Sequence, residues 1–404
     1  MNILLLTQFF DPEGTMIGLN FAKAMQMRGH HVEVLTGFPN YPGGKVYPGY
    51  RIRFRQTESM DGIKVVRVPL FPSHDRSGLK RMVNYVSFSL SAATIGQFGL
   101  SKPDIVFGYN LPTLGLPASL FRFFRGSKII FSIQDLWPES VTESGMMKSG
   151  FLNRILAWQC RRFYRKVDAL TVLSPGFRKN LISKGVLEDK VEIVYNWCNE
   201  KEMTLVDHSK LRDANQPFTV LFAGNMGKAQ ALDSVLDAAL VLRQQERNIR
   251  FRFIGKGVEV ERLKQYQEKL HLKNVEFGAA VPLTQVHWEF EKADVLLVHL
   301  QDQKLFEITI PSKIQAYLYA GKPILCGVRG DASKMVEDSG AGVCFEPENA
   351  KSLAEAVVRM SELPADRLAE MGRKGREYYM SHLCFDMAVD KIDALFRRVV
   401  AYNR

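Results

Sequence analysis

The chain alternates short apolar strands with helices, and it begins this pattern twice. Each half opens with a strand, a glycine-containing loop and a helix, at Asn2–Thr7 and Gly18–Arg28 in the first half and at Phe218–Ala223 and Leu232–Gln244 in the second. This alternation is typical of a parallel sheet covered by helices on both faces. Because 404 residues exceed one ordinary core, two domains are expected. The sequence therefore predicts an α/β protein with two doubly wound, Rossmann-like lobes.

Short apolar runs between turn residues predict the other strands. They are Val32–Thr36, Lys64–Val68, Ile105–Gly108, Lys128–Ile133, Ala169–Leu173 and Val191–Val194, then Arg250–Ile254, Val275–Phe277, Val295–Leu300, Pro323–Gly327 and Gly342–Phe345. The polar segment Asn199–Pro217 is interpreted as a linker. We expect a first lobe at residues 1–200, a second at residues 215–385, and a C-terminal helix at residues 386–404 that could pack back on the first lobe.

Composition narrows the class of protein. The hydrophobic fraction of 46% and the charged fraction of 24% are typical of a soluble globular chain. The start, MNILLLTQFFDPEG, lacks a basic segment and is interpreted as a strand, not a signal peptide. Five scattered cysteines without a C-x-x-C pair favour reduced thiols in the cytoplasm. The chain has no H-E-x-x-H motif, no Cys/His cluster and no D-x-D near a predicted strand end, so no metal is indicated.

The net charge of +11 lies almost entirely in the first half. Residues 1–200 hold 25 Lys and Arg against 15 Asp and Glu, whereas the rest of the chain is nearly balanced. Three basic clusters there lie beside aromatic or apolar residues: Arg76, Lys80 and Arg81 before Val83–Phe98; Arg122 and Arg125 among Phe121, Phe123 and Phe124; and Arg154, Arg161, Arg162, Arg165 and Lys166 around Trp158, Phe163 and Tyr164. Such clusters suit an anionic membrane surface, at about 1 kcal/mol per basic residue, although a solvated charged face over core aromatics is the alternative.

Ligands of doubly wound sheets bind beyond the carboxyl ends of the strands. After the first strand, Gly14 and Gly18 flank a helix start where backbone N–H groups could cradle a phosphate, or where a tight turn simply needs glycine. The corresponding loop of the second half, AGNMGKAQ, carries Asn225, Lys228 and Gln230. It matches neither a P-loop nor a dinucleotide fingerprint. Lys228 could neutralise a diphosphate or remain a solvated loop lysine.

A lysine stands where a helix disfavours it. Pro311 and Ser312 open a predicted helix that Gly321 ends, so Lys313 falls in the positive first turn. A cation there is disfavoured by a few tenths of a kcal/mol up to about 1 kcal/mol. An anionic ligand would reverse this, and we predict a phosphate site formed by Thr309, Ile310, Pro311, Ser312 and Lys313. Glu307 could approach a sugar hydroxyl or a developing oxocarbenium charge, or be an exposed loop carboxylate.

Two stretches of the first half also follow strand ends. Asp135 and Glu139, in SIQDLWPE, could position or deprotonate an acceptor hydroxyl, or form an Asx-turn or helix cap. The segment FPNYPGG, with Asn40 and Tyr41, is too rich in proline and glycine for regular structure and is predicted to contact substrate.

Together these residues resemble the family-4 retaining glycosyltransferases, which have the GT-B fold with two lobes facing a central cleft. The resemblance spans nearly the whole chain through QFFDPEGT, RGHHVEVLTGFPNYPGG, FSIQDLWPES, TVLSPGF, VYNW, LFAGNMGKAQ and IPSKIQAYLYAGKPIL. Within the family it is nearest to bacterial enzymes that build O-antigen or capsular polysaccharide, in particular those regarded as L-fucosamine (N-acetylfucosamine) transferases.

The resemblance implies a nucleotide-sugar donor in the second lobe and an acceptor in the first lobe. The expected nucleotide of the donor is UDP. The resemblance also implies retention at the anomeric carbon without metal or cofactor, with the leaving phosphate helping to deprotonate the acceptor. The expected acceptor is a saccharide on undecaprenyl diphosphate, and the expected location is the cytoplasmic face of the inner membrane.

Two departures from the family pattern stand out. The usual Arg and Lys of the second glycine loop fall at Asn225 and Gln230, with Lys228 between them. The usual two glutamates, eight positions apart, fall at Ile308 and Ala316. Glu307 can therefore take the first glutamate's role only from the neighbouring position, and ribose contacts must come from elsewhere.

Two other functions fit parts of the sequence. A non-hydrolysing nucleotide-sugar epimerase has the same two-lobed fold, and it would convert donor without any acceptor. A basic nucleic-acid-binding protein would explain the charge, but no nucleic-acid recognition module is present.

Overall fold

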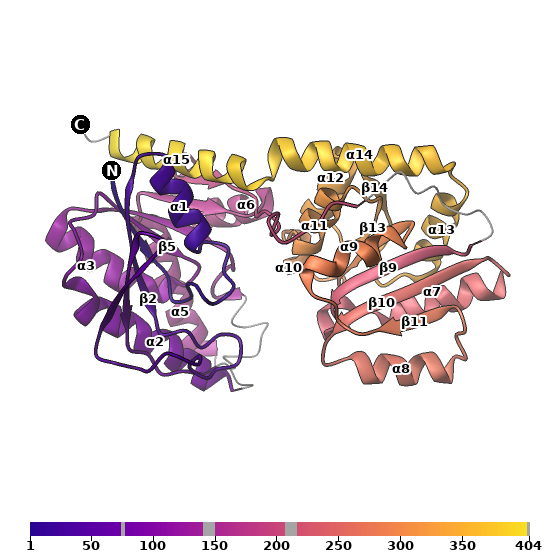
Figure 1. Ribbon diagram of the computed structural model, residues 1–404, viewed down its shortest axis with the longest axis horizontal. Helices are drawn as coiled ribbons and strands as arrows, with labels where there is room; N and C mark the ends of the chain where they lie inside the picture. The colour runs from indigo at the N-terminus through magenta and orange to yellow at the C-terminus, as the bar shows by residue number, and fades with distance from the viewer. Residues whose placement is uncertain (74–76, 140–149, 207–215, 402–404) are drawn as a thin grey trace. The chain divides into compact units, whose positions relative to one another are not determined.

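The computed structural model describes residues 1–73, 77–139, 150–206 and 216–401. These residues divide into two compact units, Met1–Val194 with the chain from Val389 onward, and Tyr195–Ala388. Each unit holds one sheet flanked by helices, as Figure 1 shows. The α/β fold of two Rossmann-like sheets is confirmed, whereas the cleft between two lobes and their donor and acceptor roles stay predictions.

The sheet of the first unit has eight strands in the order β3-β4-β2-β1-β5-β6-β7-β8. They are β1 (Asn2–Leu6), β2 (His31–Gly37), β3 (Gln56–Met60), β4 (Ile63–Val68), β5 (Ile105–Tyr109), β6 (Lys128–Ile133), β7 (Ala169–Val172) and β8 (Val191–Ile193). Every described pairing is parallel except that of β3 with β4. The edge strand β3 was not predicted.

The helices that the structure describes wholly within this unit are α1 (Leu19–Met27), α2 (Gly78–Thr94), α3 (Gly115–Arg125), α5 (Gly150–Lys166) and α6 (Pro175–Ser183). A further helix, α15 (Phe385–Ala401), begins in the second unit and ends in the first. Its Asp390 accepts a hydrogen bond from Arg28 Nε at 3.0 Å, and its Phe396 ring meets the Phe107 ring edge-on at 5.1 Å. The part of α15 that contains Asp390 and Phe396 is therefore packed against the first unit.

The sheet of the second unit has six parallel strands in the order β11-β10-β9-β12-β13-β14. They are β9 (Phe218–Asn225), β10 (Ile249–Lys256), β11 (Val275–Gly278), β12 (Val295–His299), β13 (Ile324–Gly327) and β14 (Gly342–Cys344). The helices are α7 (Asp233–Gln244), α8 (Val260–Lys269), α9 (Val286–Glu291), α10 (Lys304–Glu307), α11 (Ser312–Ala320), α12 (Asp331–Asp338), α13 (Ala350–Ser361) and α14 (Ala365–His382).

Both faces of the second sheet are buried, which explains its continuous apolar strands. Along β9, Leu221 and Ala223 belong to one hydrophobic cluster, whereas Val220 and Phe222 belong to the other. The chain order reverses beside β1 in the first sheet and beside β9 in the second. Ligands of such sheets bind at this switch point, so both glycine loops lie where a ligand is expected. Within the described residues, no helix has the length and apolar character needed to cross a membrane.

Candidate active site

Lys313 lies in the first turn of α11, as predicted. The helix starts after Pro311 and ends before Gly321, whose φ is 73°. The Lys313 ammonium lies 4.4 Å from the centroid of the Phe222 ring. Burial lowers the pKa of Lys313 to about 8, and no charged group among the described residues contributes to this change. The side chain is therefore a desolvated cation without an acidic partner in the described part of the chain.

A cavity of about 330 Å³ opens beside Lys313 at the carboxyl ends of β9 and β10. Asn225, Ser312 and Lys313, all predicted to bind donor, line it. Its other lining residues are mostly apolar: Met203, Ala223, Gly224, Ile254, Gly255, Lys256, Ala280, Val281, Leu283, Val286, Phe290, Ala316 and Tyr317. Two ammonium groups and no carboxylate occur among the described lining residues. An apolar cavity with a cationic rim suits a nucleoside diphosphate, with the base inside and the phosphates at the lysines.

Lys256 is the second of these cations, and the sequence analysis missed it. It ends β10 between Gly255 and Gly257, and its side chain is exposed. Gly255 has a φ of 143°, and a Cβ there would lie 1.9 Å from the carbonyl oxygen of Gly224. Only glycine permits this close approach of β9 and β10. A lysine between two glycines just after a predicted strand was the available signal.

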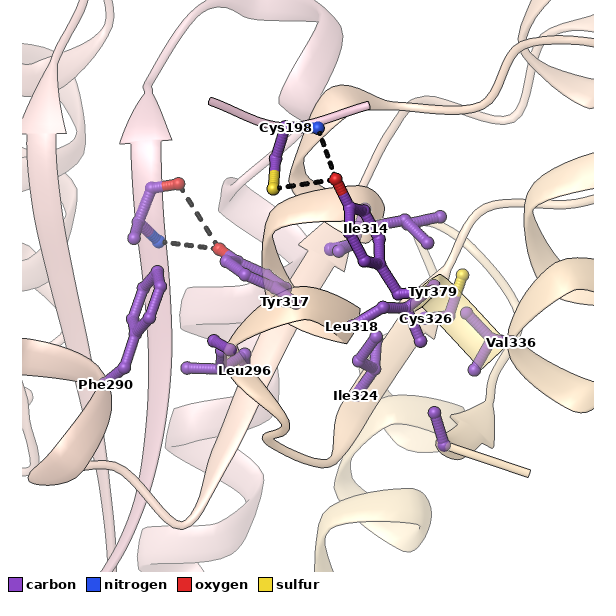
Figure 2. Packing of buried hydrophobic residues seen from close by; sticks show 14 of the residues in the cluster. Cys198, Phe290, Leu296, Ile314, Tyr317, Leu318, Ile324, Cys326, Val336 and Tyr379 are labelled. Carbon is purple, nitrogen blue, oxygen red and sulfur yellow. Dashed lines mark hydrogen bonds between the residues drawn. The ribbon is translucent and has the colours of Figure 1, made fainter. Parts of the chain in front are cut away.

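Tyr317 fixes α11 against the end of β9. Its hydroxyl accepts a hydrogen bond from the backbone N–H of Ala223 at 3.2 Å and donates to the carbonyl of the same residue at 3.3 Å (Figure 2). The described pairing of β12 with β9 ends at Leu221, so this hydroxyl satisfies backbone groups that the sheet leaves unpaired. The Phe290 ring packs edge-on against Tyr317 at 5.5 Å. Tyr317 therefore holds Lys313 and the second glycine loop in one rigid frame.

The other predicted donor-binding residues have different surroundings. Lys228 is exposed in a short turn. Gln230 Oε1 accepts the N–H of Gly227 at 2.8 Å, so this side chain closes its own loop. Thr309 Oγ1 donates to the Leu305 carbonyl at 2.9 Å, and Ile310 is buried in the core. The side chains of Gln230, Thr309 and Ile310 thus shape the backbone of the site, while Lys228 stays free to face a ligand.

His299, which the sequence analysis did not single out, joins two loops at the carboxyl edge of this sheet. The Glu348 N–H donates to His299 Nε2 at 2.9 Å, which makes Nδ1 the protonated nitrogen, and Nδ1 donates to the Gln230 carbonyl at 2.7 Å. Burial lowers the pKa of His299, so the ring is neutral. It contributes no charge to a ligand and acts as a brace.

Glu307, the predicted catalytic carboxylate, ends α10 and is exposed. Its backbone is fixed more tightly than its side chain. A Cβ on Gly330 would lie 2.0 Å from the Glu307 carbonyl oxygen, and Gly330 has a φ of 77°. The loop after β13 therefore packs directly on Glu307 and holds it at the carboxyl edge of the sheet.

Asp135, the predicted catalytic residue of the first unit, is exposed just after β6. Asn110, which follows β5, donates from Nδ2 to Asp135 Oδ2 at 3.0 Å and accepts the Asp135 N–H at Oδ1 at 3.1 Å. This reciprocal pair of hydrogen bonds fixes the position of the exposed Asp135 side chain. Asn110 has a φ of 65°, a conformation that asparagine tolerates better than most residues.

The remaining predicted acceptor residues lie in the same unit. Glu139 forms an ion pair with Lys184 at 2.6 Å, so its charge is already balanced. Buried Glu13 accepts the N–H groups of Asn40 and Tyr41, each at 2.6 Å, and so shapes the loop that was predicted to contact substrate. Burial raises the pKa of Glu13 although these bonds oppose the rise. Gly14, which was predicted to bind the donor and not the acceptor, lies beside Glu13 and is exposed.

Two family models match the chain in succession. The description "Glycosyl transferase 4-like domain" matches residues 18–197, and "Glycosyl transferases group 1" matches residues 205–378. The chain belongs to the family-4 glycosyltransferases of the GT-B fold. The predicted family is thereby confirmed, and the epimerase alternative is not favoured.

Curated relatives agree with this family, and a solved structure agrees with the fold. The glycosyltransferase is 26% identical over 396 residues to WcaI of Escherichia coli K12, which is named as a colanic acid biosynthesis glycosyl transferase, and the match covers 90% of this chain and 93% of WcaI. It is 24% identical to WbjE of Pseudomonas aeruginosa, named as a glycosyltransferase, over 81% and 82% of the two chains. Its fold is similar to that of Anabaena HepE in complex with UDP-glucose, with a TM-score of 0.66, 15% identity and full coverage of both chains.

A larger cavity, of about 650 Å³, lies in the first unit of the glycosyltransferase, beside strand β8. Asp168 and Lys190 line it, and these residues precede β7 and β8. Arg178 and Arg398 on its wall already pair with Glu188 and Glu192, at 2.9 and 3.0 Å. Paired charges at the amino ends of strands indicate a structural surface.

No group of three or more potential ligands that could hold a metal ion occurs among the residues that the structure describes. Metal independence of the glycosyltransferase stays a prediction.

Proposed function

We propose that this glycosyltransferase moves a sugar, with retention of anomeric configuration and without a metal, from a nucleotide sugar to a lipid-linked saccharide. The proposed donor is UDP-N-acetyl-L-fucosamine. The proposed acceptor is a saccharide on undecaprenyl diphosphate, at the cytoplasmic face of a bacterial inner membrane. The product would be a unit of O-antigen or capsular polysaccharide, in keeping with the name of WcaI.

The observation that carries the donor assignment is the unpaired, desolvated ammonium of Lys313 beside an apolar cavity. Holding a cation out of water without an acidic partner is unfavourable for the empty protein. A diphosphate would supply the missing anion, and Lys256 would add a second positive charge at the same rim. HepE, which has a similar fold, was solved with UDP-glucose.

The proposed role of Lys313 in the reaction follows from the negative charge that develops on the leaving phosphate. As the bond from the sugar to the diphosphate breaks, negative charge grows on the leaving phosphate, and a fixed ammonium in a poorly solvated site stabilises it. Lys313 is held there by α11, so little reorganisation is needed. The exposed carboxylate of Glu307 would face positive charge on the sugar, and the carboxylate of Asp135 would orient the acceptor hydroxyl.

Membrane contact of the first unit is part of the proposal. Its exposed side chains include Leu79 and Leu90 on α2, Phe123 and Phe124 on α3, and Phe151 and Trp158 on α5. Arg162 lies 5.8 Å from the Trp158 ring, beside further exposed arginines of α5. Rings with adjacent cations suit an interface with anionic lipid. Arg76, counted among the basic residues, lies outside the described residues.

The donor assignment is tested by a thermal-shift panel of UDP, ADP, GDP and dTDP with their sugar conjugates. A ligand at 100 times its dissociation constant adds about 2.7 kcal/mol of stability, and UDP compounds should give the largest increase in melting temperature. A flat panel would overturn the assignment. Transfer from UDP-N-acetyl-L-fucosamine, followed by NMR of the product's anomeric proton with and without EDTA, tests the sugar, retention and metal independence.

The membrane assignment is tested by flotation with phosphatidylglycerol and phosphatidylcholine vesicles. Preferential flotation with the anionic vesicles is expected, and equal recovery with both would count against it. The variant Trp158→Ser, with exposed Trp288→Ser in the second unit as its matched control, should lose part of this binding.

A further inference from the structure

Arg81, in the first unit, has a buried guanidinium nitrogen without a hydrogen-bond partner among the described residues. It lies on α2, four residues after Ser77 and four before Tyr85. Its side chain is half-buried, yet its Nε is fully buried and has no hydrogen-bond acceptor in the described structure. Arg67, by contrast, donates from Nε to Glu58 at 2.6 Å. Leaving a buried N–H of a charged group unpaired is unfavourable, so an acceptor from outside the chain would stabilise Arg81.

Tyr85 and Asp135 lie near Arg81. Tyr85 lies one turn further along the same face of α2, and its ring centroid is 6.1 Å from that of Trp137. The charges of Arg81 and Asp135 both interact electrostatically with the Tyr85 hydroxyl. Burial raises the pKa of Tyr85, the Arg81 guanidinium opposes this rise, and Asp135 adds to it. A cation, two aromatic rings and the proposed acceptor carboxylate thus lie together at the carboxyl edge of the first sheet.

We infer that Arg81 binds a phosphate of the lipid-linked acceptor, with half-buried Tyr85, backed by the buried Trp137 ring, beside the acceptor's first sugar and Asp135 at its reacting hydroxyl. This inference rests on the proposed function and adds a subsite to it. A guanidinium presents a fork of N–H donors that matches phosphate oxygens. Aromatic side chains combine an apolar face with polar edges, which suits a sugar.

The position of Arg81 on α2 agrees with a ligand anchored in lipid. Leu79, Val83, Val86 and Leu90 are exposed and recur at helical spacing on the opposite side of α2 from Arg81 and Tyr85. One face of the helix would therefore meet the bilayer surface while the other meets the headgroup end of the acceptor. A phosphate held at Arg81 would fix the distance between the lipid anchor and the reacting sugar.

The test uses geranyl diphosphate, a water-soluble probe, titrated calorimetrically into the full-length protein with the donor site saturated by UDP. The wild type should bind the probe, and geraniol should not bind measurably. Arg81→Gln should weaken probe binding at least tenfold, and Arg81→Lys, which keeps the charge but not the fork, should weaken it less. Arg53→Gln, an equal change of charge at an exposed arginine of the same unit, should leave the affinity within twofold.

Several results would overturn the inference. They are unchanged affinity in Arg81→Gln, equal binding of geraniol and geranyl diphosphate, or loss of probe binding when UDP is present, which would place the probe in the donor cavity. Loss of flotation on phosphatidylglycerol vesicles by Arg81→Gln, with probe binding intact, would assign Arg81 to a phospholipid headgroup instead. A titration with UDP, made before the probe is added, keeps the two proposals separate. Failure to bind UDP would contradict the proposed donor site and not the Arg81 subsite.

Discussion

Lys313→Met removes the ammonium of α11 while keeping an apolar stem of similar length over the Phe222 ring. Burial lowers the pKa of Lys313 from 10.5 to about 8. A pKa that falls by one pH unit on folding disfavours the charged form by about 1.36 kcal/mol, so at pH 7 the charged side chain opposes folding by about 3 kcal/mol. We expect Lys313→Met to unfold at equal or higher urea concentration than the wild type when no nucleotide is present.

The direction in which the free energy of unfolding changes with pH follows from how many protons the folded and unfolded chains bind. Between pH 8 and 10.5 the unfolded chain keeps a proton on Lys313 that the folded chain has lost. Stability rises with pH wherever the unfolded state binds more protons. The wild type should therefore gain stability relative to Lys313→Met as pH rises from 8 to 10.5, and the difference should level off above that range. Urea unfolding of both proteins at pH 7, 9 and 10 measures this gain.

The charged Lys313 side chain destabilises the empty protein, but it should strengthen donor binding. A hydrogen bond to a charged group contributes about 1.5–3 kcal/mol, so Lys313→Met should weaken UDP binding at pH 7 by about 10- to 150-fold. Because UDP binds the protonated lysine, wild-type affinity should fall by up to about tenfold per pH unit above 8. The variant should show no such fall. Equal UDP affinity of the two proteins at pH 7, or a parallel pH dependence, would refute the reasoning.

Three further changes test the surrounding frame. Tyr317→Phe leaves the N–H and carbonyl of Ala223 without their hydroxyl partner and should lower the free energy of unfolding by about 1–3 kcal/mol; an unchanged urea midpoint would contradict the bracing role of Tyr317. Lys256→Ala should weaken UDP binding severalfold at low salt and less at high salt, since its ammonium is exposed and screened; calorimetry at two salt concentrations measures this. Asp135→Asn can still accept from Asn110, so UDP affinity should not change, whereas the transfer rate should fall by about 10²–10⁴ if the carboxylate acts on the acceptor proton; an unchanged rate would remove Asp135 from the reaction.

The alternation of elements was predictable because it depends on local pattern. Strands such as Lys128–Ile133 are continuous apolar runs, and buried parallel strands have this composition. The strand β3 was missed because Gln56–Met60 is polar and lies at an edge, where only one neighbour is needed. Its formation depends on pairing with β4, which is a tertiary interaction that composition does not reveal.

The candidate site was predictable only where a residue breaks a local rule. Lys313 could be found because a cation in the first turn of a helix is unfavourable. Gln230 and Thr309 were chosen as ligands, but their side chains bond to nearby backbone, a use that residue type does not distinguish from ligand binding. Glu139 pairs with Lys184, distant in sequence, and Lys256 reaches the cavity only because β10 lies beside β9. These features arise from the packing of segments, so sequence patterns could not supply them.

The part of α15 from Val389 onward has a consequence for how the protein is made. The chain from Val389 onward completes the first unit, but the ribosome reaches it only after the whole of Tyr195–Ala388 has been synthesised. At about 5–20 residues per second, this interval lasts roughly 10–40 s. During that time the ring of Phe107 and the imidazole of His30 lack Phe396 and Asp393, their partners on α15. The nascent first unit therefore spends this interval with part of its core open to water and to chaperones.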